Sequence, residues 1–246
     1  MKGDSNKTSC FAEQEIGCPD FKPKIILFSS CRLDGLLAEK SYIHEIHHTH
    51  NTKELIQYIQ YINGDIDIDK EMHKYVFRSC FLKPDTLIDR DQLKKDFLSS
   101  DIICIELCSR KKYTKNGYFI HHLAADKGDA PVKNLIEESK STEEYTLELQ
   151  SKEEIEQDIV KICNMLNEKK LIFVTHIDYG IEKRKTLIDE VSEICNRHNI
   201  PYVNPSEKFK TLQKEMIDSN HYTPKGLKIV AGLVIEKLID KNVLPP

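Results

Sequence analysis

Short, continuous apolar runs separated by amphipathic segments constrain the fold of this chain more than any other feature. The runs cover residues 24–28, 102–107 and 171–175, with a weaker run at 201–204 and a further strand candidate at 42–46. Such runs are typical of strands buried on both faces of a sheet. Strands that alternate with helices need crossover connections, so we predict a mainly parallel sheet.

Helices are indicated between these runs by their caps and by apolar residues at helical spacing. Asn51 and Glu54 can cap a helix over 53–63 that ends at Gly64, and Ser151 with Glu154 forms a capping-box pair. The apolar faces that follow contain Ile155, Ile159, Ile162 and Leu166 in one helix, and Leu187, Val191 and Ile194 in the next. The predicted fold class is α/β, a three-layer α/β/α domain with a mainly parallel, flavodoxin-like central sheet.

The length of 246 residues and the apolar content of 39% suit one domain. We expect residues 1–22 to be a polar lead-in and residues 23–246 to form a single α/β domain. Residues 65–98 look helical and charged, which suggests an inserted helical cap. Residues 108–150 are long for a connection, and loops of that length are often functional or mobile.

Charge and cysteine usage exclude several classes of protein. The formal net charge is −4 without a basic face, which does not favour a nucleic-acid partner. None of the eight cysteines has C-x-x-C spacing, and several lie in apolar segments where a free thiol behaves as a small hydrophobe. Residues 1–15 lack the apolar core of a signal peptide, and the apolar stretch at 229–235 is too short for a membrane span. We therefore expect a cytoplasmic protein with free cysteines.

The segment from Asp218 to Gly226 carries the most specific chemistry. Thr223 is a suitable N-cap and Pro224 a suitable first helical residue, which places His221 on a loop just before a helix. Asp218 lies three residues earlier on the same loop and could hold the Nδ1–H of His221. The Nε2 atom would then be free to accept a proton from a nucleophile.

Polar side chains also follow the apolar runs, at the sheet edge where ligands bind in open parallel sheets. The first run continues into Ser29, Ser30, Cys31 and Arg32. The run at 102–107 continues into Cys108, Ser109 and Arg110, and the run at 171–175 into His176. These residues are the candidates for the rest of the site.

The Asp218–His221 block with its Thr-Pro-x-Gly helix start resembles the last block of SGNH/GDSL hydrolases. In that family a nucleophilic serine follows the first strand, and the Ser-Ser-Cys-Arg block at 29–32 resembles a Gly-Ser-Cys variant of it. The resemblance implies that Ser30 is the nucleophile and that Asp218 and His221 complete the triad. It also implies an oxyanion hole from the serine N–H, a glycine and an asparagine, for which the candidates here are Gly64, Ser109, Arg110 and Asn116.

Several residues near the expected nucleophile can be interpreted either as functional or as structural. Ser29 and Cys31 are alternative nucleophiles, although we expect the Cys31 side chain on the opposite side of the turn from Ser30. Arg32 could bind a substrate carboxylate or phosphate, or be a solvated arginine at a helix start. His176 could contact substrate or be a hydrogen-bonded structural histidine.

Two further clusters have weaker signals. One is a histidine group in which no Glu or Cys completes a metal motif, so we interpret it as a polar strand edge or loop and predict no metal; it comprises His44, His47, His48 and His50. The other is a basic and aromatic segment that could recognise a phosphate or coenzyme A, or form a solvated lid, which we favour; it comprises Arg110, Lys111, Lys112, Tyr113, Lys115, Tyr118 and Phe119.

The leading hypothesis is therefore a serine esterase that removes an acyl group from a carbohydrate, lipid or small-molecule ester without a cofactor. One alternative is an acyltransferase that passes the acyl group to a sugar, with coenzyme A as a possible donor. Another is an inactive binding or structural protein on the same fold, because the oxyanion donors of the family are not evident in the sequence.

Overall fold

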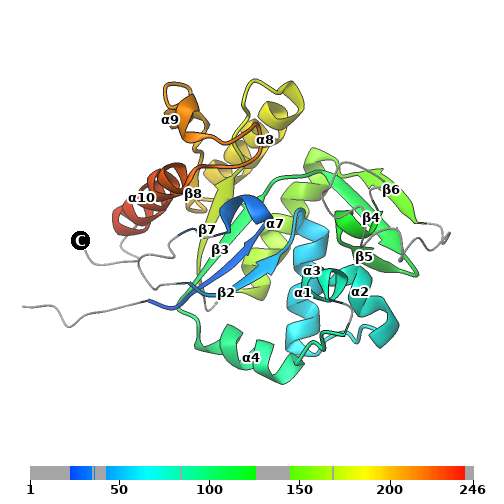
Figure 1. Ribbon diagram of the computed structural model, residues 1–246. Coiled ribbons are helices and arrows are strands. Elements are labelled where there is room, and N and C mark those ends of the chain that lie inside the picture. Colours follow the sequence, from blue (N-terminus) through cyan, green and yellow to red (C-terminus); the bar gives the residue numbers. More distant parts are fainter. Residues whose placement is uncertain are drawn as a thin grey trace, which may run out of the picture.

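The computed structural model describes residues 23–34, 36, 43–83, 85–125, 145–167 and 169–241. The lead-in expected at 1–22 lies outside the described residues. Helices and strands alternate along most of this length (Figure 1).

The centre of the molecule is a five-stranded, entirely parallel sheet in the order β2-β1-β3-β7-β8. All five expected strands are present, so the predicted sheet is confirmed. Their bounds are Ile25–Ser29 for β1, Ile43–His48 for β2, Ile102–Leu107 for β3, Lys170–Thr175 for β7 and Tyr202–Val203 for β8.

The connections contain the helices. The longer ones are α1 (Thr52–Asn63), α4 (Arg90–Ser99), α7 (Lys152–Met165), α8 (Glu182–Arg197) and α10 (Pro224–Asp240). The short ones are α2 (His73–Val76), α3 (Arg78–Leu82), α5 (His122–Ala125) and α9 (Ser206–Phe209), with 3-10 turns η1 (Cys31–Leu33), η3 (Lys70–Met72) and η4 (Gln213–Glu215).

The caps expected from the sequence are made. The side chains of Asn51, Ser151 and Thr223 accept hydrogen bonds from the N–H groups three residues on, at 3.0, 3.1 and 3.0 Å. Gly64 ends α1 with φ of 85°, a left-handed conformation that favours glycine. These caps explain why the helix boundaries could be read from the sequence.

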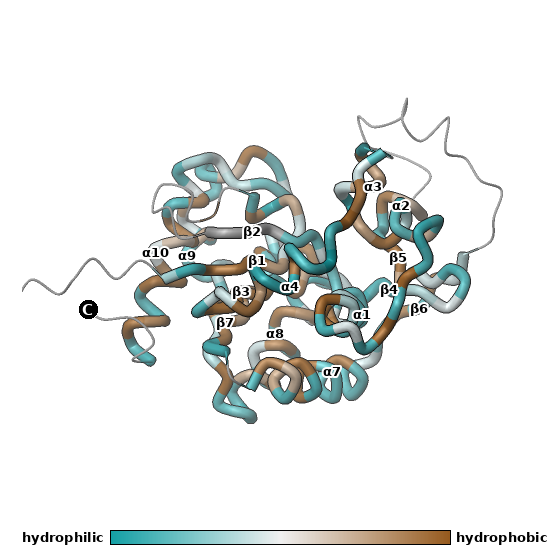
Figure 2. Tube along the Cα trace, turned by 90° about the horizontal axis from the view of Figure 1, so that it is seen from below, coloured by the Kyte–Doolittle hydropathy of each residue, from teal (hydrophilic) through white to brown (hydrophobic). Residues whose placement is uncertain are grey.

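Two apolar cores cover the two faces of the sheet, which gives three layers. Alternate residues of the strands, such as Ile26 and Ile103, pack with α1, α7 and α8 on one face. Their neighbours, such as Leu27 and Cys104, pack with α10 on the other face. Figure 2 shows the apolar residues concentrated along the strands and on one side of the surrounding helices. The predicted three-layer α/β/α class is confirmed.

The region after β3 differs from expectation, because much of it forms a second, antiparallel sheet in the order β5-β4-β6. Its strands are β4 (Lys111–Lys115), β5 (Tyr118–Ile120) and β6 (Thr146–Leu149). The expected solvated lid is therefore a strand with its side chains engaged: Tyr113 is buried, and Lys112 forms ion pairs with Glu148 and Glu154. Asn116 and Gly117, with φ of 50° and 83°, make the tight turn between β4 and β5.

The residues 65–98, where a helical cap was expected, contain η3, α2, α3 and α4, and these helices pack in two different places. Helix α4 packs against α1 and leads back to the start of β3. Helices α2 and α3 contact β5 and α5 instead. Arg78 of α3 reaches the loop after β1, where its guanidinium lies 3.5 Å from the Asp34 carboxylate.

Among the described residues, no helix combines the length and the apolar character that crossing a bilayer requires.

Candidate active site

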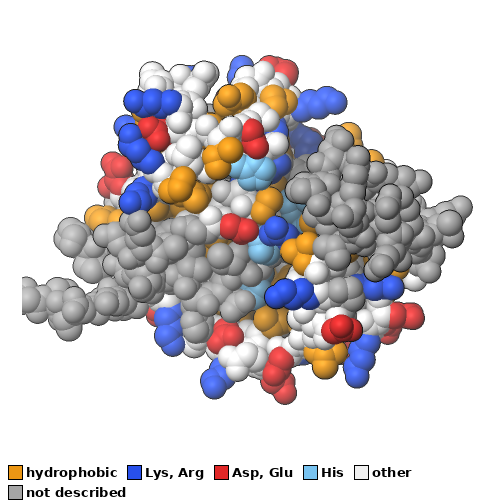
Figure 3. Space-filling view, viewed as in Figure 1, with side chains coloured by type: hydrophobic (Ala, Val, Ile, Leu, Met, Phe, Trp, Pro, Cys, Tyr) orange, Lys and Arg blue, Asp and Glu red, His pale blue; other side chains and the backbone are white. Residues whose placement is uncertain are grey.

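The carboxyl ends of β1, β3 and β7 meet at one edge of the central sheet, and the loop before α10 lies at the same edge. Histidine, Lys and Arg side chains gather along the middle of this face of the molecule (Figure 3). They lie between the part that contains α8 to α10 and the part that contains α1 to α3.

The structure brings Asp218 and His221 together on this loop. Their closest contact joins His221 Nδ1 to Asp218 Oδ2 at 2.9 Å, and the His221 backbone N–H donates to Asp218 Oδ1 at 2.8 Å. Hydrogen bonds from His221 and from the Asn220 N–H lower the pKa of Asp218. The carboxylate is therefore charged at neutral pH and fixes the imidazole with Nδ1–H toward itself.

The loop is held at both ends. The Arg184 guanidinium of α8 donates to the Ser219 carbonyl and the Asn220 side chain. At the start of α10, a Cβ on Gly226 would stand 2.3 Å from the Glu215 carbonyl oxygen. Only glycine allows this approach, so the sequence of the first helical turn sets the position of the loop.

Ser30 is fully buried, and its polar atoms are turned toward β3. Its N–H and its hydroxyl both donate to Glu106 Oε2, at 2.8 and 2.7 Å. Burial raises the pKa of the Glu106 carboxyl, while the charge of Arg32 and the two hydrogen bonds act in the opposite direction. Ser30 therefore has the environment of a residue that fixes the turn.

The side chain that faces His221 is Cys31. Its Sγ lies 3.9 Å from His221 Nε2, a long hydrogen-bond distance for sulfur. As expected, Ser30 and Cys31 point to opposite sides of the turn, but the side chain toward His221 is that of Cys31 and not that of Ser30. The physical reason is the buried Glu106 carboxylate, which holds the Ser30 hydroxyl and leaves the next residue of the turn to face the loop.

Burial raises the pKa of the Cys31 thiol, and the charges of Arg78 and Arg32 offset part of this effect. The thiol is therefore protonated at neutral pH, and nucleophilic chemistry at its sulfur requires a base. His221 Nε2 is the neighbouring group that can accept the proton.

The sequence matches the TviD N-terminal domain family over residues 25–128 and 129–237. The chain belongs to this family. The match includes both the turn that contains Cys31 and the loop that contains Asp218 and His221.

Two curated proteins are similar over part of the chain. The Vi polysaccharide biosynthesis protein TviD of Salmonella typhi is 37% identical over 92 residues, which are 32% of this chain and 11% of that protein. A lysine–tRNA ligase of Sulfolobus acidocaldarius is 33% identical over 98 residues, 38% of this chain and 18% of that protein. The chain thus matches less than a fifth of the length of either relative.

Two solved structures are distantly similar. A family 3 carbohydrate esterase of Clostridium thermocellum has a TM-score of 0.43 and 11% identity, covering 89% of this chain and 96% of that one. A two-domain esterase active on acetylated mannans has a TM-score of 0.42 and 10% identity, covering 91% and 51%. The parallel sheet has the order 2-1-3-4-5 when its strands are counted along the chain, which is the order of the flavodoxin-like sheet predicted from the sequence.

Two further candidates from the sequence, Arg32 and His176, lie near Cys31 and Glu106 in this TviD-type domain. His176 is almost completely buried, and its Nδ1 lies 3.7 Å from Glu106 Oε1. Burial, with the charges of Arg32 and Arg184, lowers the pKa of His176 well below its ordinary value. His176 is thus a neutral residue, and Arg32 supplies a positive charge that acts on Cys31, Glu106 and His176.

The four expected oxyanion donors have other roles in the structure. Gly64 caps the C-terminal end of α1, whereas β2 leads into the N-terminal end of that helix. The Asn116 amide in the β4–β5 turn donates to Met72 Sδ. Ser109 donates its N–H to the His50 carbonyl at 3.0 Å. Arg110 is engaged with Glu190 and the Gln150 carbonyl.

Glu106 is the site residue that the sequence analysis missed. A single carboxylate inside the continuous apolar run of β3 was the available signal, because a buried charge needs partners. A pocket of about 410 Å³ also opens after β7, lined by Asp178, Tyr179 and residues of α8 and α9. None of Cys31, Asp218 and His221 lines it, so the candidate chemistry lies outside this pocket.

Proposed function

We propose that this chain is an acyl-transfer enzyme that forms or cleaves saccharide esters, with Cys31 as nucleophile, His221 as base and Asp218 as the carboxylate that orients the base. One observation carries the proposal. The Cys31 sulfur, the His221 ring and the Asp218 carboxylate form a continuous line of contacts at 3.9 and 2.9 Å. This is the order of nucleophile, base and orienting acid that covalent acyl transfer needs.

In the first half-reaction, His221 Nε2 accepts the thiol proton while the Cys31 sulfur attacks the acyl carbonyl carbon. The tetrahedral intermediate collapses when its bond to the leaving oxygen breaks, and His221 returns the proton to that oxygen. The product is a thioester on Cys31 and a free alcohol. Asp218 stabilises the His221 imidazolium that forms during this step, because its negative carboxylate contacts Nδ1.

In the second half-reaction, the thioester reacts with water or with a sugar hydroxyl. His221 accepts the proton of the attacking group and then returns it to the sulfur, which restores the Cys31 thiol. Water gives the hydrolase of our leading hypothesis, and a sugar hydroxyl gives the transferase.

The developing oxyanion needs donors at the same turn. Ser30 is the N-cap of η1, so the Cys31 N–H belongs to the first groups of a helical turn, which lack intrahelical acceptors. The Arg32 guanidinium, next in the chain, supplies positive charge beside the sulfur. These two groups replace the glycine and asparagine donors of the SGNH/GDSL resemblance in our proposal.

Transfer to a sugar is favoured over simple hydrolysis by one comparison. TviD is named for polysaccharide biosynthesis, and a biosynthetic role fits the attachment of acyl groups better than their removal. We therefore propose a saccharide hydroxyl as the acceptor and an activated acyl ester or thioester as the donor.

Turnover of p-nitrophenyl acetate, with and without an oligosaccharide acceptor, tests this proposal. We expect Cys31→Ala and His221→Ala to reduce kcat by at least about 100-fold, because each removes a group that bonds or transfers the proton. We expect Ser30→Ala to retain activity within about tenfold, since Ser30 only fixes the turn. Activity that survives in Cys31→Ala but is lost in Ser30→Ala would reverse the assignment.

A further inference from the structure

A cluster of three histidines lies beside the candidate active site and has no part in the proposed chemistry. His50 follows β2, while His121 and His122 follow β5 at the start of α5. One ligand atom from each of the three lies within 4.8 Å of the others. The ring centroids are 4.2 Å apart for His50 and His122, and 4.6 Å apart for the other two pairs.

Two of these histidines each have one buried ring nitrogen without a hydrogen-bond partner among the described residues. His50 and His121 are 7% and 1% exposed. Within the described part of the chain, His50 Nδ1 and His121 Nε2 have no hydrogen-bond partner. Buried polar atoms are normally paired, so the unpaired His121 Nε2, within a cluster of three histidines, indicates a missing ligand.

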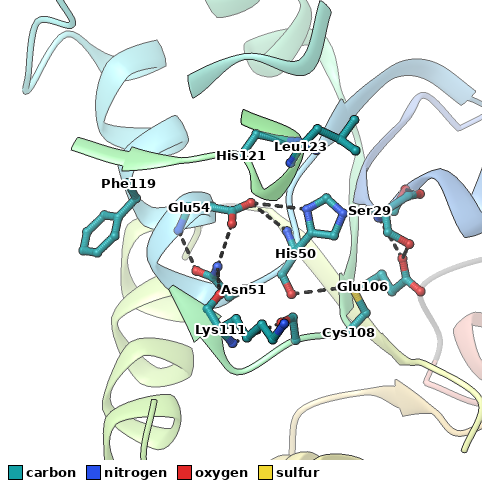
Figure 4. Close-up of polar contacts among 12 residues, drawn as sticks. Ser29, His50, Asn51, Glu54, Glu106, Cys108, Lys111, Phe119, His121 and Leu123 are labelled. Atoms are coloured by element: carbon teal, nitrogen blue, oxygen red, sulfur yellow. Dashed lines mark hydrogen bonds and ion pairs between the residues drawn. The ribbon is translucent and has the colours of Figure 1, made fainter. Parts of the chain in front are cut away.

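The surroundings hold the cluster in place as an outer shell does around a metal ligand. The Glu54 carboxylate accepts the His50 N–H at 2.9 Å, and its Oε2 lies 3.5 Å from His50 Nδ1 (Figure 4). The His121 N–H donates to the Tyr75 carbonyl at 2.8 Å. A carboxylate beside a ligating imidazole fixes its tautomer and orientation in known metal sites.

We propose that His50, His121 and His122 bind a divalent metal ion of the zinc type, with a fourth position open to water. Three imidazole nitrogens suit Zn²⁺ and are poor ligands for Mg²⁺ or Ca²⁺, which prefer oxygen. Zn–N bonds of roughly 2.0–2.1 Å require the three nitrogens to draw together from their present spacing. The site links the antiparallel sheet to the end of β2, and it is independent of the proposed function.

Binding has a structural consequence at α5. The Leu123 N–H donates to His121 Nδ1 at 3.2 Å, so the lone pair of that nitrogen is already engaged. If Nε2 of His121 binds the metal, its Nδ1 must carry the proton and the hydrogen bond from Leu123 is lost. Metal binding is therefore expected to shift the first turn of α5.

Titration of the tag-free, full-length protein with Zn²⁺ and with Co²⁺ tests this site. We expect one ion per chain, an increase in Tm, and a Co²⁺ spectrum of a nitrogen-ligated ion without a sulfur-to-metal charge-transfer band. His122→Asn, at the least buried of the three positions, is expected to raise Kd by more than about 100-fold, because losing a ligand exceeds the cost of losing its outer-shell partner.

His198→Asn is the matched control, since His198 lies at the end of α8 and contacts Glu156. It should bind like the parent. His121→Gln, checked for folding by circular dichroism, should also lose the site. Unchanged affinity in both cluster variants, a Co²⁺ spectrum dominated by thiolate, or an absence of stoichiometric binding would each overturn the proposal, and none of these results bears on Cys31.

Discussion

Cys31 and Ser30 are adjacent in the chain, yet they face different chemistry because of one buried carboxylate. Glu106 accepts both the N–H and the hydroxyl of Ser30, which turns that side chain toward β3. The following residue then faces the loop of His221. A sequence pattern identifies such a turn but cannot decide between neighbours, because the choice depends on a partner 76 residues away.

The pairing of Asp218 with His221 was accessible from the sequence for the opposite reason. Both residues lie on one short loop, and the Thr223 cap and Pro224 fix where the helix begins. Local chemistry therefore determined their geometry. The oxyanion donors could not be predicted in this way, since they depend on how distant strands assemble.

At the residue scale, we predict that Arg78→Gln makes the Cys31 thiol less acidic. Arg78 is the strongest charge that lowers the pKa of this thiol, and without it Arg32 alone opposes burial and the Asp34 charge, which both raise that pKa. Alkylation of Cys31 by iodoacetamide at pH 7.5, followed by peptide mapping, should slow by about two- to tenfold, which corresponds to a pKa change of up to about one unit. Arg197→Gln, on the exposed end of α8, should leave the rate unchanged; equal rates in all three proteins would contradict the prediction.

At the element scale, capped helices and continuous apolar strands could be predicted because their signals are local. The antiparallel sheet could not, since β4 carries charged residues whose ion pairs, such as that of Lys112 with Glu154, join residues far apart in the sequence. A basic segment read in isolation looks like a solvated loop. In the fold, the same side chains are paired and Tyr113 is buried between them.

The start of α10 provides a prediction at this scale. Gly226→Ala places a methyl group 2.3 Å from the Glu215 carbonyl oxygen, so the first turn of α10 and the loop before it must move. We expect a loss of about 1–3 kcal/mol in the free energy of unfolding, measured by urea denaturation, together with reduced kcat.

Gly232→Ala is the matched control on the same helix. A Cβ at Gly232 meets nothing within 4 Å, and alanine favours a helix interior more than glycine does. We expect it to be neutral or to stabilise by up to about 1 kcal/mol. Equal losses in the two variants would show that the close approach at Gly226 has no special role.

At the scale of the whole molecule, the packing of α1 on the parallel sheet buries His47 of β2. The Nδ1 atom of His47 lies 3.1 Å from the hydroxyl of Tyr58 in α1. Burial, with the charge of His48, lowers the pKa of His47 to about 3, while Asp96 acts in the opposite direction. The unfolded chain protonates this residue near pH 6.5, and the folded chain does not until about pH 3. Stability attributed to His47 is therefore full above about pH 6.5 and is lost progressively as the pH falls toward 3.

Urea denaturation at pH 7 and pH 5 measures this effect. The displaced pKa predicts a loss of about 2 kcal/mol over this interval from His47 alone. His47→Asn should lower the stability at pH 7 and reduce the dependence on pH by a comparable amount. A variant with the same pH dependence as the parent would show that folding does not displace the pKa of His47.

The central claim is that the acyl group passes through the sulfur of Cys31. The most direct measurement is to quench the protein during turnover of an activated acyl ester and to locate the adduct by peptide mass spectrometry, with and without neutral hydroxylamine. We predict one acyl group on Cys31 that neutral hydroxylamine removes, in the parent and in Ser30→Ala, and no hydroxylamine-labile acyl group in Cys31→Ser. A stable ester on Ser30, or no acyl-enzyme at all during turnover, would contradict it.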